Sequence, residues 1–302
     1  MLKFSVLFAA AVAGVQLMSA GVGSDHKTTD YARQIEAFRA ARVDRLKAPQ
    51  GWLSLIGLYW LKEGNNTIGS AKDNDVVLSK GPAHLGSVAL HDGKATIHVA
   101  AGTSTLIDGK PERVAELLDD SHPEPTKVQF GTVSFYLIDR SGKKGLRVKD
   151  TDAPTRTHFV GLDYFPIDPS WRIEAKWVPF KPMRQIEIPS VIGTVDKMPV
   201  PGKAEFTRGG KTYSLLPVLE EPDAKELFFI MADRTSGKET YGAARFMYTD
   251  LPQDGKVVLD FNKAYNPPCA FTPYATCPLP PPGNRLDLAV TAGEKKYRGA
   301  PH

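Results

Sequence analysis

Hydrophobic and polar positions follow a helical period at the start of the chain and a strand-like period after it. Between residues 25 and 48, apolar side chains recur at helical spacing among charged ones, which predicts an N-terminal helix. Pro49 and Gly51 end this helix. The apolar stretch 51–61 that follows predicts a buried strand or helix that caps the first sheet.

From residue 64 onward, short apolar–polar runs are separated by turn residues. The Asp92-Gly93 and Asp108-Gly109 pairs predict turns, and short strands at such regular spacing favour a β-sandwich. A loop rich in Pro, Thr and Asp at residues 151–156 marks a domain boundary. Beyond it, further alternating runs such as 171–178 predict a second β-rich domain.

The expected fold class is therefore mainly β, with an N-terminal helix, a β-sandwich and a second β-rich domain. We expect four segments in the chain. They are a signal peptide at 1–24, a helix with its apolar lead-in at 25–62, a sandwich at 63–155 and a C-terminal domain at 156–302.

The N-terminus is typical of a secretory signal peptide. Lys3 precedes an apolar run at residues 4–17, and small residues at Ser19-Ala20 follow it. An uncleaved membrane anchor is the alternative. No later segment is long and apolar enough to cross a membrane, so we expect an exported protein, periplasmic or extracellular, without a membrane span after cleavage.

The charge balance argues against nucleic acid as a partner. The 302 residues include 38 Lys and Arg against 34 Asp and Glu, a formal net charge of +4, and the two signs alternate along the chain. Nucleic-acid binding proteins carry a basic stripe that is missing from this pattern. The sequence identifies neither a cofactor nor an oligomeric state.

Cys269 and Cys277 are the two cysteines of the chain. In an exported protein such a neighbouring pair forms a disulfide, and two reduced structural thiols or a reactive thiol are the alternatives. Their spacing is too wide for a CxxC pair and there is no second pair, so no metal site is expected. As a nucleophile Cys269 needs a histidine base, for which His158 is the candidate.

A dense polar segment, residues 233–294, is the candidate site. A carboxylate or tyrosine there can act as acid or base, while arginine and asparagine hold negative charge. The candidate catalytic residues are Asp233, Arg245, Asp260, Tyr265 and Cys269. The candidate ligand-binding residues are Thr240, Tyr241, Asn262, Asn266 and Asn284. The alternative is structural, because Asx side chains before prolines organise turns and buried Asp–Arg pairs tie loops.

Residues 236–240, Ser-Gly-Lys-Glu-Thr, are similar in composition to a phosphate-binding loop. The Walker pattern requires a glycine five residues before Gly237, where this chain has Ala232. A tight hairpin between 227–232 and 244–248 is therefore the favoured interpretation.

Short segments of the chain resemble two known families. Ile68-Gly69-Ser70 and residues 74–78 resemble the opening of a forkhead-associated domain, a β-sandwich. Ser70 and Asp108 replace the arginine and asparagine that contact phosphate in that family, so the resemblance implies the scaffold and not phosphopeptide binding.

The segments 51–55, 233–242, 260–271 and 277–285 resemble proteins of the family called domain of unknown function 1684, and this resemblance extends over nearly the whole mature chain. Because no activity is established for that family, the resemblance implies no mechanism. We expect a protein that binds a small polar ligand in a pocket of the C-terminal domain. A hydrolase or lyase acting on such a ligand, and a structural or protein-interaction module of the envelope, are the alternatives.

Overall fold

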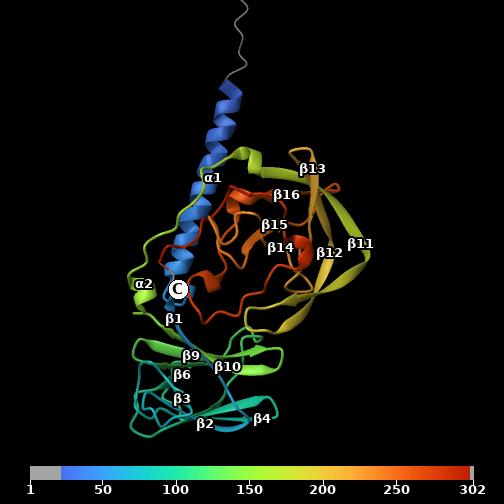
Figure 1. Ribbon diagram of the computed structural model, residues 1–302. Helices are drawn as coiled ribbons and strands as arrows, with labels where there is room; N and C mark the ends of the chain where they lie inside the picture. Colours follow the sequence, from blue (N-terminus) through green and yellow to red (C-terminus); the bar gives the residue numbers. More distant parts are fainter. Residues whose placement is uncertain (1–21, 300–302) are drawn as a thin grey trace, which may run out of the picture.

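The structure, a computed structural model, describes residues 22–299. Apart from residues 22–24, the predicted signal peptide lies outside the described residues. The chain is mainly β and has one long helix, α1 (Val22–Lys47), which confirms the predicted fold class. Figure 1 shows α1 lying along a large, curled β body, with its C-terminal end at the junction with a smaller sandwich. Among residues 22–299, no helix has the length and apolarity needed to cross a membrane.

The sandwich consists of two five-stranded sheets. One has the order β1-β10-β9-β8-β6 and the other β3-β2-β4-β5-β7. Side chains from both sheets, including those of Ile68, Val88, Ile97, Phe135 and Leu146, are fully buried between them. The strands are β1 (Leu55–Trp60), β2 (Gly64–Gly69), β3 (Val76–Val77), β4 (Gly86–His91), β5 (Lys94–Val99), β6 (Leu106–Ile107), β7 (Val114–Glu116), β8 (Lys127–Phe130), β9 (Val133–Arg140) and β10 (Lys143–Asp150).

Local sequence explains two features of this sandwich. Asp92-Gly93 and Asp108-Gly109 have positive φ at both residues (50° and 76°, 48° and 78°), which is the conformation that Asp-Gly turns provide. The apolar stretch 51–61 forms the short 3-10 helix η1 (Trp52–Ser54) and then β1, which is an edge strand of the first sheet rather than a cap on it. The resemblance to a forkhead-associated domain stays a prediction.

The C-terminal part is built around a curled four-stranded sheet with the order β13-β12-β11-β16. A separate hairpin of β14 and β15 packs within it, and β14 is buried over five consecutive residues, 227–231. The elements are α2 (Pro154–Thr157), η2 (Pro169–Trp171), β11 (Arg172–Pro189), β12 (Val195–Arg208), β13 (Lys211–Leu215), β14 (Glu226–Met231), β15 (Arg245–Asp250), β16 (Lys256–Asp260), η3 (Phe261–Lys263), η4 (Pro268–Ala270) and η5 (Pro282–Asn284).

The pairing of β14 with β15 confirms the predicted hairpin, but the prediction of a tight turn was wrong. Met231 pairs with Arg245, so residues 232–244 form a long loop between the strands. This loop and the mostly strand-free segment after residue 260 contain the polar residues singled out in the sequence. Backbone groups in such irregular segments need side-chain partners when they are buried.

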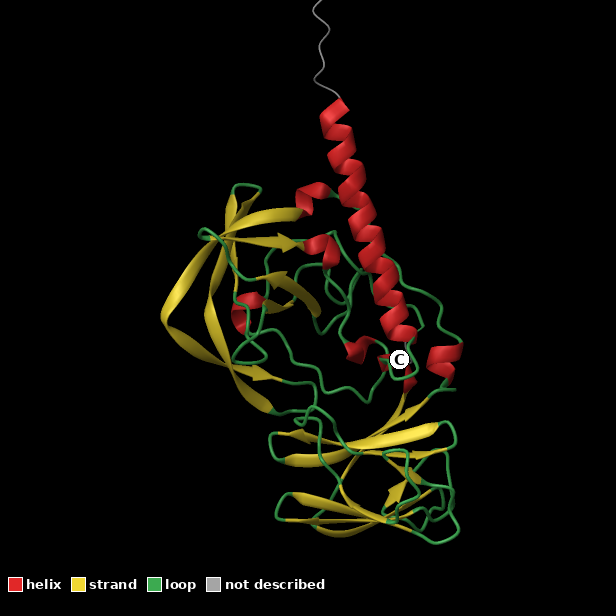
Figure 2. Cartoon of the chain, turned by 180° about the vertical axis from the view of Figure 1, so that it is seen from behind, coloured by secondary structure: helices red, strands yellow, loops and turns green. Residues whose placement is uncertain are grey.

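Helix α1 is fixed to the C-terminal part by one buried face. Ile35 and Leu46 on this face are fully buried, and the guanidinium of Arg42 lies 3.0 Å from the carboxylate of Glu294. Glu294 is 0% exposed, and its other oxygen accepts the N–H of Asn266 at 2.8 Å. Burial raises the pKa of Glu294, which Arg42 and this N–H oppose. Figure 2 shows from behind how the helix lies beside the irregular C-terminal segment.

The first testable prediction concerns this ion pair. We expect Arg42→Ala to lower the free energy of unfolding by about 3–5 kcal/mol, because Glu294 would remain buried without a counter-ion. Urea denaturation followed by circular dichroism measures this change. The control is Arg33→Ala on the same helix, whose side chain is 71% exposed and whose removal should change stability by less than about 0.5 kcal/mol. Equal effects of the two substitutions would contradict the anchoring role of Arg42.

Candidate functional site

Asp233 and Arg245 form a buried ion pair that ties loops together. Their side chains are 0% and 1% exposed, and Arg245 Nη2 lies 2.5 Å from Asp233 Oδ2. Asp233 Oδ1 also accepts the N–H and the hydroxyl of Thr235 at 2.7 and 2.6 Å. Arg245 donates to the carbonyls of Val290 and Ala292 at 3.0 and 2.5 Å. The pair therefore joins loop 232–244 to the C-terminal segment.

Thr240 extends the same network, because its hydroxyl lies 2.8 Å from that of Thr235 and is fully buried. Asn284 has a similar role at another point of the chain. Its amide pairs with both backbone groups of Leu216 at 2.8 Å and donates to the carbonyl of Ile230 at 2.9 Å. These contacts are those of residues that hold irregular backbone in place.

Asp260 and Asn262 connect the end of β16 to helix α1. Asp260 Oδ1 accepts the hydroxyl of Tyr31 at 2.8 Å and the N–H of Asn262 at 3.2 Å. Asn262 Nδ2 donates to the same hydroxyl and to the carbonyl of Asp168, both at 2.9 Å. Burial and the neighbouring Asp260 raise the pKa of Tyr31 above its ordinary value. The two side chains do face one side, as their spacing predicts, and they serve to dock the helix.

Asn266 and Tyr241 also make contacts with the backbone. Asn266 Nδ2 donates to the carbonyl of Lys295 at 2.7 Å. The buried Asn266 Oδ1 has no hydrogen-bond partner within residues 22–299. The hydroxyl of Tyr241 donates to the carbonyl of Cys269 at 3.1 Å. All ten residues singled out in the sequence make contacts within the protein, and Tyr265 is the one of them that also lines a cleft.

The two cysteines lie together as free thiols. The N–H of Cys269 donates to the sulfur of Cys277 at 3.1 Å. A hydrogen bond from Cys277 lowers the pKa of the Cys269 thiol, whereas this bond and burial raise the pKa of Cys277. His158, the candidate base, is exposed at the end of α2, where its Nδ1 lies 3.2 Å from the carbonyl of Pro154. The disulfide stays a prediction that this proximity permits.

A cleft of about 940 Å³ lies where α1, the sandwich and the C-terminal part meet, and Tyr265 is the candidate catalytic residue that lines it. From α1, Phe38, Arg42 and Arg45 face it at positions i, i+4 and i+7, which share one side of a helix. The other side chains around it come from the turn and 3-10 helix before β1, the end of β9, the loop before β14, β14, β15 and the segment after β16. They include Gln50, Trp52, Arg140, Glu220, Glu226, Phe228, Phe246, Tyr248, Lys263, Thr276 and Cys277.

The inner wall of the cleft is a stack of aromatic rings. Phe228 and Tyr248 stack with centroids 4.7 Å apart, and Tyr248 and Tyr265 with centroids 6.4 Å apart at 12° between the planes. The guanidinium carbon of Arg42 lies 4.6 Å from the centroid of Tyr265, on the helix side. The hydroxyl of Tyr248 donates to Glu220 at 2.7 Å. Burial is the main cause that raises the pKa of both tyrosines, so both stay protonated at neutral pH.

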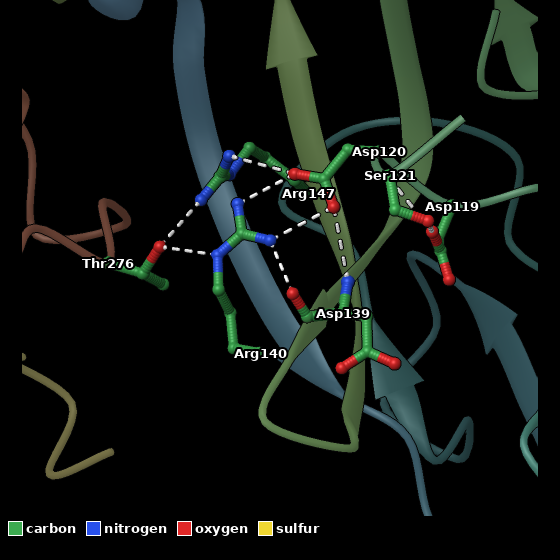
Figure 3. A network of polar contacts seen from close by, with 7 residues as sticks. All are labelled: Asp119, Asp120, Ser121, Asp139, Arg140, Arg147 and Thr276. Atoms are coloured by element: carbon green, nitrogen blue, oxygen red, sulfur yellow. Dashed lines mark hydrogen bonds and ion pairs between the residues drawn. The ribbon is translucent and has the colours of Figure 1, made fainter. Parts of the chain in front are cut away.

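A polar network at the junction with the sandwich forms the other end of the cleft (Figure 3). Arg140 donates to both oxygens of Asp120 at 2.9 and 2.6 Å. The hydroxyl of Thr276 accepts from Arg140 at 3.0 Å and from Arg147 at 3.2 Å. Arg147 also lies 5.3 Å from the ring of Trp52. One hydroxyl of the C-terminal part thus holds two arginines of the sandwich, and this fixes the relative position of the cleft walls.

The sequence did not point to most of these cleft residues. The spacing of Phe38, Arg42 and Arg45 was a signal, because it places an aromatic and two cations on one side of the helix. Trp52 and Arg140 carry no comparable signal, since their position depends on how the two β bodies pack. Within the described part of the chain, no group of three His, Cys, Asp or Glu side chains is arranged to hold a metal ion.

Fold and site together define a two-part β protein with an aromatic cleft at the junction of its parts. Residues 157–295 match the family described as protein of unknown function (DUF1684), so the C-terminal region of the chain is similar to that family. The match does not include the sandwich, so the expected similarity over nearly the whole mature chain is limited to this region.

The chain was also compared with curated proteins and with solved structures. A search of curated proteins found no significant match. Among solved structures, the solution NMR structure of an uncharacterised protein from Haloarcula marismortui is 30% identical to this chain. The alignment covers 48% of this chain and 80% of that protein, with a TM-score of 0.41.

The second prediction concerns the Asp233–Arg245 pair. We expect Arg245→Ala to reduce the free energy of unfolding by about 3–5 kcal/mol, because it leaves a buried carboxylate without its counter-ion. The control is Arg285→Ala, an exposed arginine of the same segment, which should change it by less than about 0.5 kcal/mol. Chemical denaturation of both variants gives the values. A well-folded Arg245→Ala protein of unchanged stability would exclude a structural role for the pair.

The third prediction concerns the two thiols. In the reduced protein we expect Cys269 to react with a thiol reagent well before Cys277, because Cys269 is more exposed and its pKa is lowered. Cys277→Ala should slow the reaction of Cys269, since it removes the hydrogen bond that favours the thiolate. Stopped-flow thiol titration at pH 7 measures both rates.

Cys269→Ala is the control for this assignment, and it should abolish the fast phase. Equal rates for the two thiols in the native protein would contradict the assignment. Protein isolated without reductant from an oxidising compartment answers the disulfide question separately, because a disulfide leaves no thiol to titrate until it is reduced.

Proposed function

We propose that this protein binds a small organic molecule in the junction cleft. The observation that carries the proposal is the gathering of partly exposed aromatic side chains from separate segments around one cavity, among them Phe38, Trp52, Tyr248 and Tyr265. The volume of about 940 Å³ is within the range of about 300–1,000 Å³ that is usual for ligand sites. Aromatic walls with a few polar groups at their edges are the usual lining of such sites.

The states of the candidate acid–base residues favour ligand binding over hydrolysis. Asp233, a candidate acid or base in the sequence, and Arg245, a candidate to hold negative charge, are occupied by each other and by the backbone. In the cleft itself, the raised pKa values of Tyr248 and Tyr265 make these hydroxyls hydrogen-bonding groups rather than bases at neutral pH. The proposal therefore assigns ligand recognition to the residues that line the cleft and structural support to the Asp233–Arg245 pair.

We also propose that this binding takes place outside the cytoplasm. The support is the pattern of Lys3, the apolar run 4–17 and the small residues after it in the sequence.

The fourth prediction tests the site. In a thermal-shift screen of amino acids, peptides, sugars, nucleotides and aromatic acids, we expect at least one class of compound to raise the melting temperature by a few degrees. A ligand at 100 times its dissociation constant contributes about 2.7 kcal/mol. Phe38→Ala should abolish the shift, because it removes a ring from the helix side of the cleft.

Phe159→Ala is the matched control, since Phe159 is a partly buried ring that stacks on Tyr297 away from the cleft. This variant should keep the ligand-induced shift. The proposal would be contradicted by the lack of any shift across the panel, or by a shift that Phe38→Ala leaves unchanged.

A further inference from the structure

We infer that the ligand of the junction cleft is a short peptide of about two to four residues with apolar side chains and both ends free. This inference rests on the proposed function and names the chemical class of its ligand. It follows from the distribution of charge around the cleft after its internal ion pairs have been accounted for.

Two of the four cations that line the cleft are already neutralised within the protein. Arg42 pairs with Glu294 at 3.0 Å and donates to the carbonyl of Asn266 at 2.8 Å. Arg140 pairs with Asp120 at 2.6 Å. These two arginines therefore hold the walls in place and are not available to balance the charge of a ligand.

The other two cations, Arg45 and Lys263, are on the helix side of the cleft. The ammonium of Lys263 lies 5.9 Å from the ring of Phe38 on α1, and Arg45 is exposed one helical turn beyond Arg42. Among residues 22–299, neither side chain forms an ion pair. This side of the cleft presents two positive charges that suit a carboxylate.

Two acids, Glu220 and Glu226, are on the strand side of the cleft. Glu220 accepts the hydroxyl of Tyr248, and Glu226 opens β14 two residues before Phe228, so both carboxylates lie at the Phe228–Tyr248 end of the aromatic stack. Neither takes part in an ion pair within the described part of the chain. This side presents two negative charges that suit an ammonium group.

The aromatic stack extends from Arg42 on the helix toward the two acids. It begins at Arg42 of the helix, continues through Tyr265 and Tyr248, and ends at Phe228 beside the acids. A free amino acid is too short to reach both sides, because its ammonium and carboxylate are attached to the same carbon. An extended chain gains about 3.3–3.6 Å per residue, so two to four residues match the length of the stack. Apolar side chains of such a peptide would pack against the rings.

The test is isothermal titration calorimetry with the tripeptide phenylalanyl-glycyl-phenylalanine in four forms: free, N-acetylated, C-amidated and blocked at both ends. We expect each single block to weaken binding about two- to fivefold, which is the size expected for one partly exposed charge contact. The doubly blocked peptide should bind weakest.

Variants of the cleft identify which charged side of the cleft binds which terminus of the peptide. In Arg45→Ala with Lys263→Ala, the C-amidated and free peptides should bind equally, while N-acetylation should still weaken binding. In Glu220→Gln with Glu226→Gln, the N-acetylated and free peptides should bind equally, while C-amidation should still weaken binding. The amide of Gln at position 220 still accepts a hydrogen bond from Tyr248. The controls are Arg33→Ala with Lys72→Ala and Glu112→Gln with Glu124→Gln, which remove exposed charges away from the cleft and should preserve both differences.

The outcomes separate this inference from the proposed function. Equal affinity for all four forms would overturn the charge assignment while leaving the cleft as a binding site. Failure of every tripeptide to bind, with a different compound of the thermal-shift screen binding in a Phe38-dependent manner, would overturn the ligand class alone. If no compound of either set binds, both the inference and the proposed function fail.

Discussion

The buried ion pair of Arg42 and Glu294 is the interaction on which the rest of the structure depends. Two charges separated by 252 positions in the chain are removed from water together, which is favourable only because each has further partners. Glu294 accepts the N–H of Asn266, and Arg42 donates to the carbonyl of the same residue. Arg42 also packs on Tyr265, so the contact that fixes the helix also fixes one ring of the cleft wall.

The dense polar segment near the C-terminus is best understood as a frame for this cleft. Most of the chain after residue 260 lacks regular strands, so its buried backbone groups take side chains as partners. The Asp233–Arg245 pair and the amides of Asn262 and Asn284 supply these partners. The sequence left two interpretations of this segment open, one structural and one catalytic. The contacts of most of its polar side chains agree with the structural interpretation. The inner wall of the cavity is formed by aromatic residues.

The parts of this structure that could be predicted from the sequence are those encoded locally. The period of apolar residues identified α1, and the Asp92-Gly93 and Asp108-Gly109 pairs identified turns whose positive φ values the structure contains. Most of the cleft could not be predicted from the sequence, because Phe38, Trp52, Arg140 and Tyr265 come together only when the helix and the two β bodies dock. Polar density along the chain therefore pointed mainly to residues that hold loops, and of the cavity residues it identified only Tyr265.

The central claim is that one ligand contacts α1 and the C-terminal part in the same cleft. Hydrogen–deuterium exchange with and without the compound that gives the largest thermal shift tests it most directly, because exchange reports on each segment separately. The account predicts slower exchange on ligand binding in residues 38–52, 226–228, 246–248 and 263–278, with no change in β2, β4 and β5 at the far side of the sandwich. Protection confined to the sandwich, or protection that leaves α1 unchanged, would contradict it.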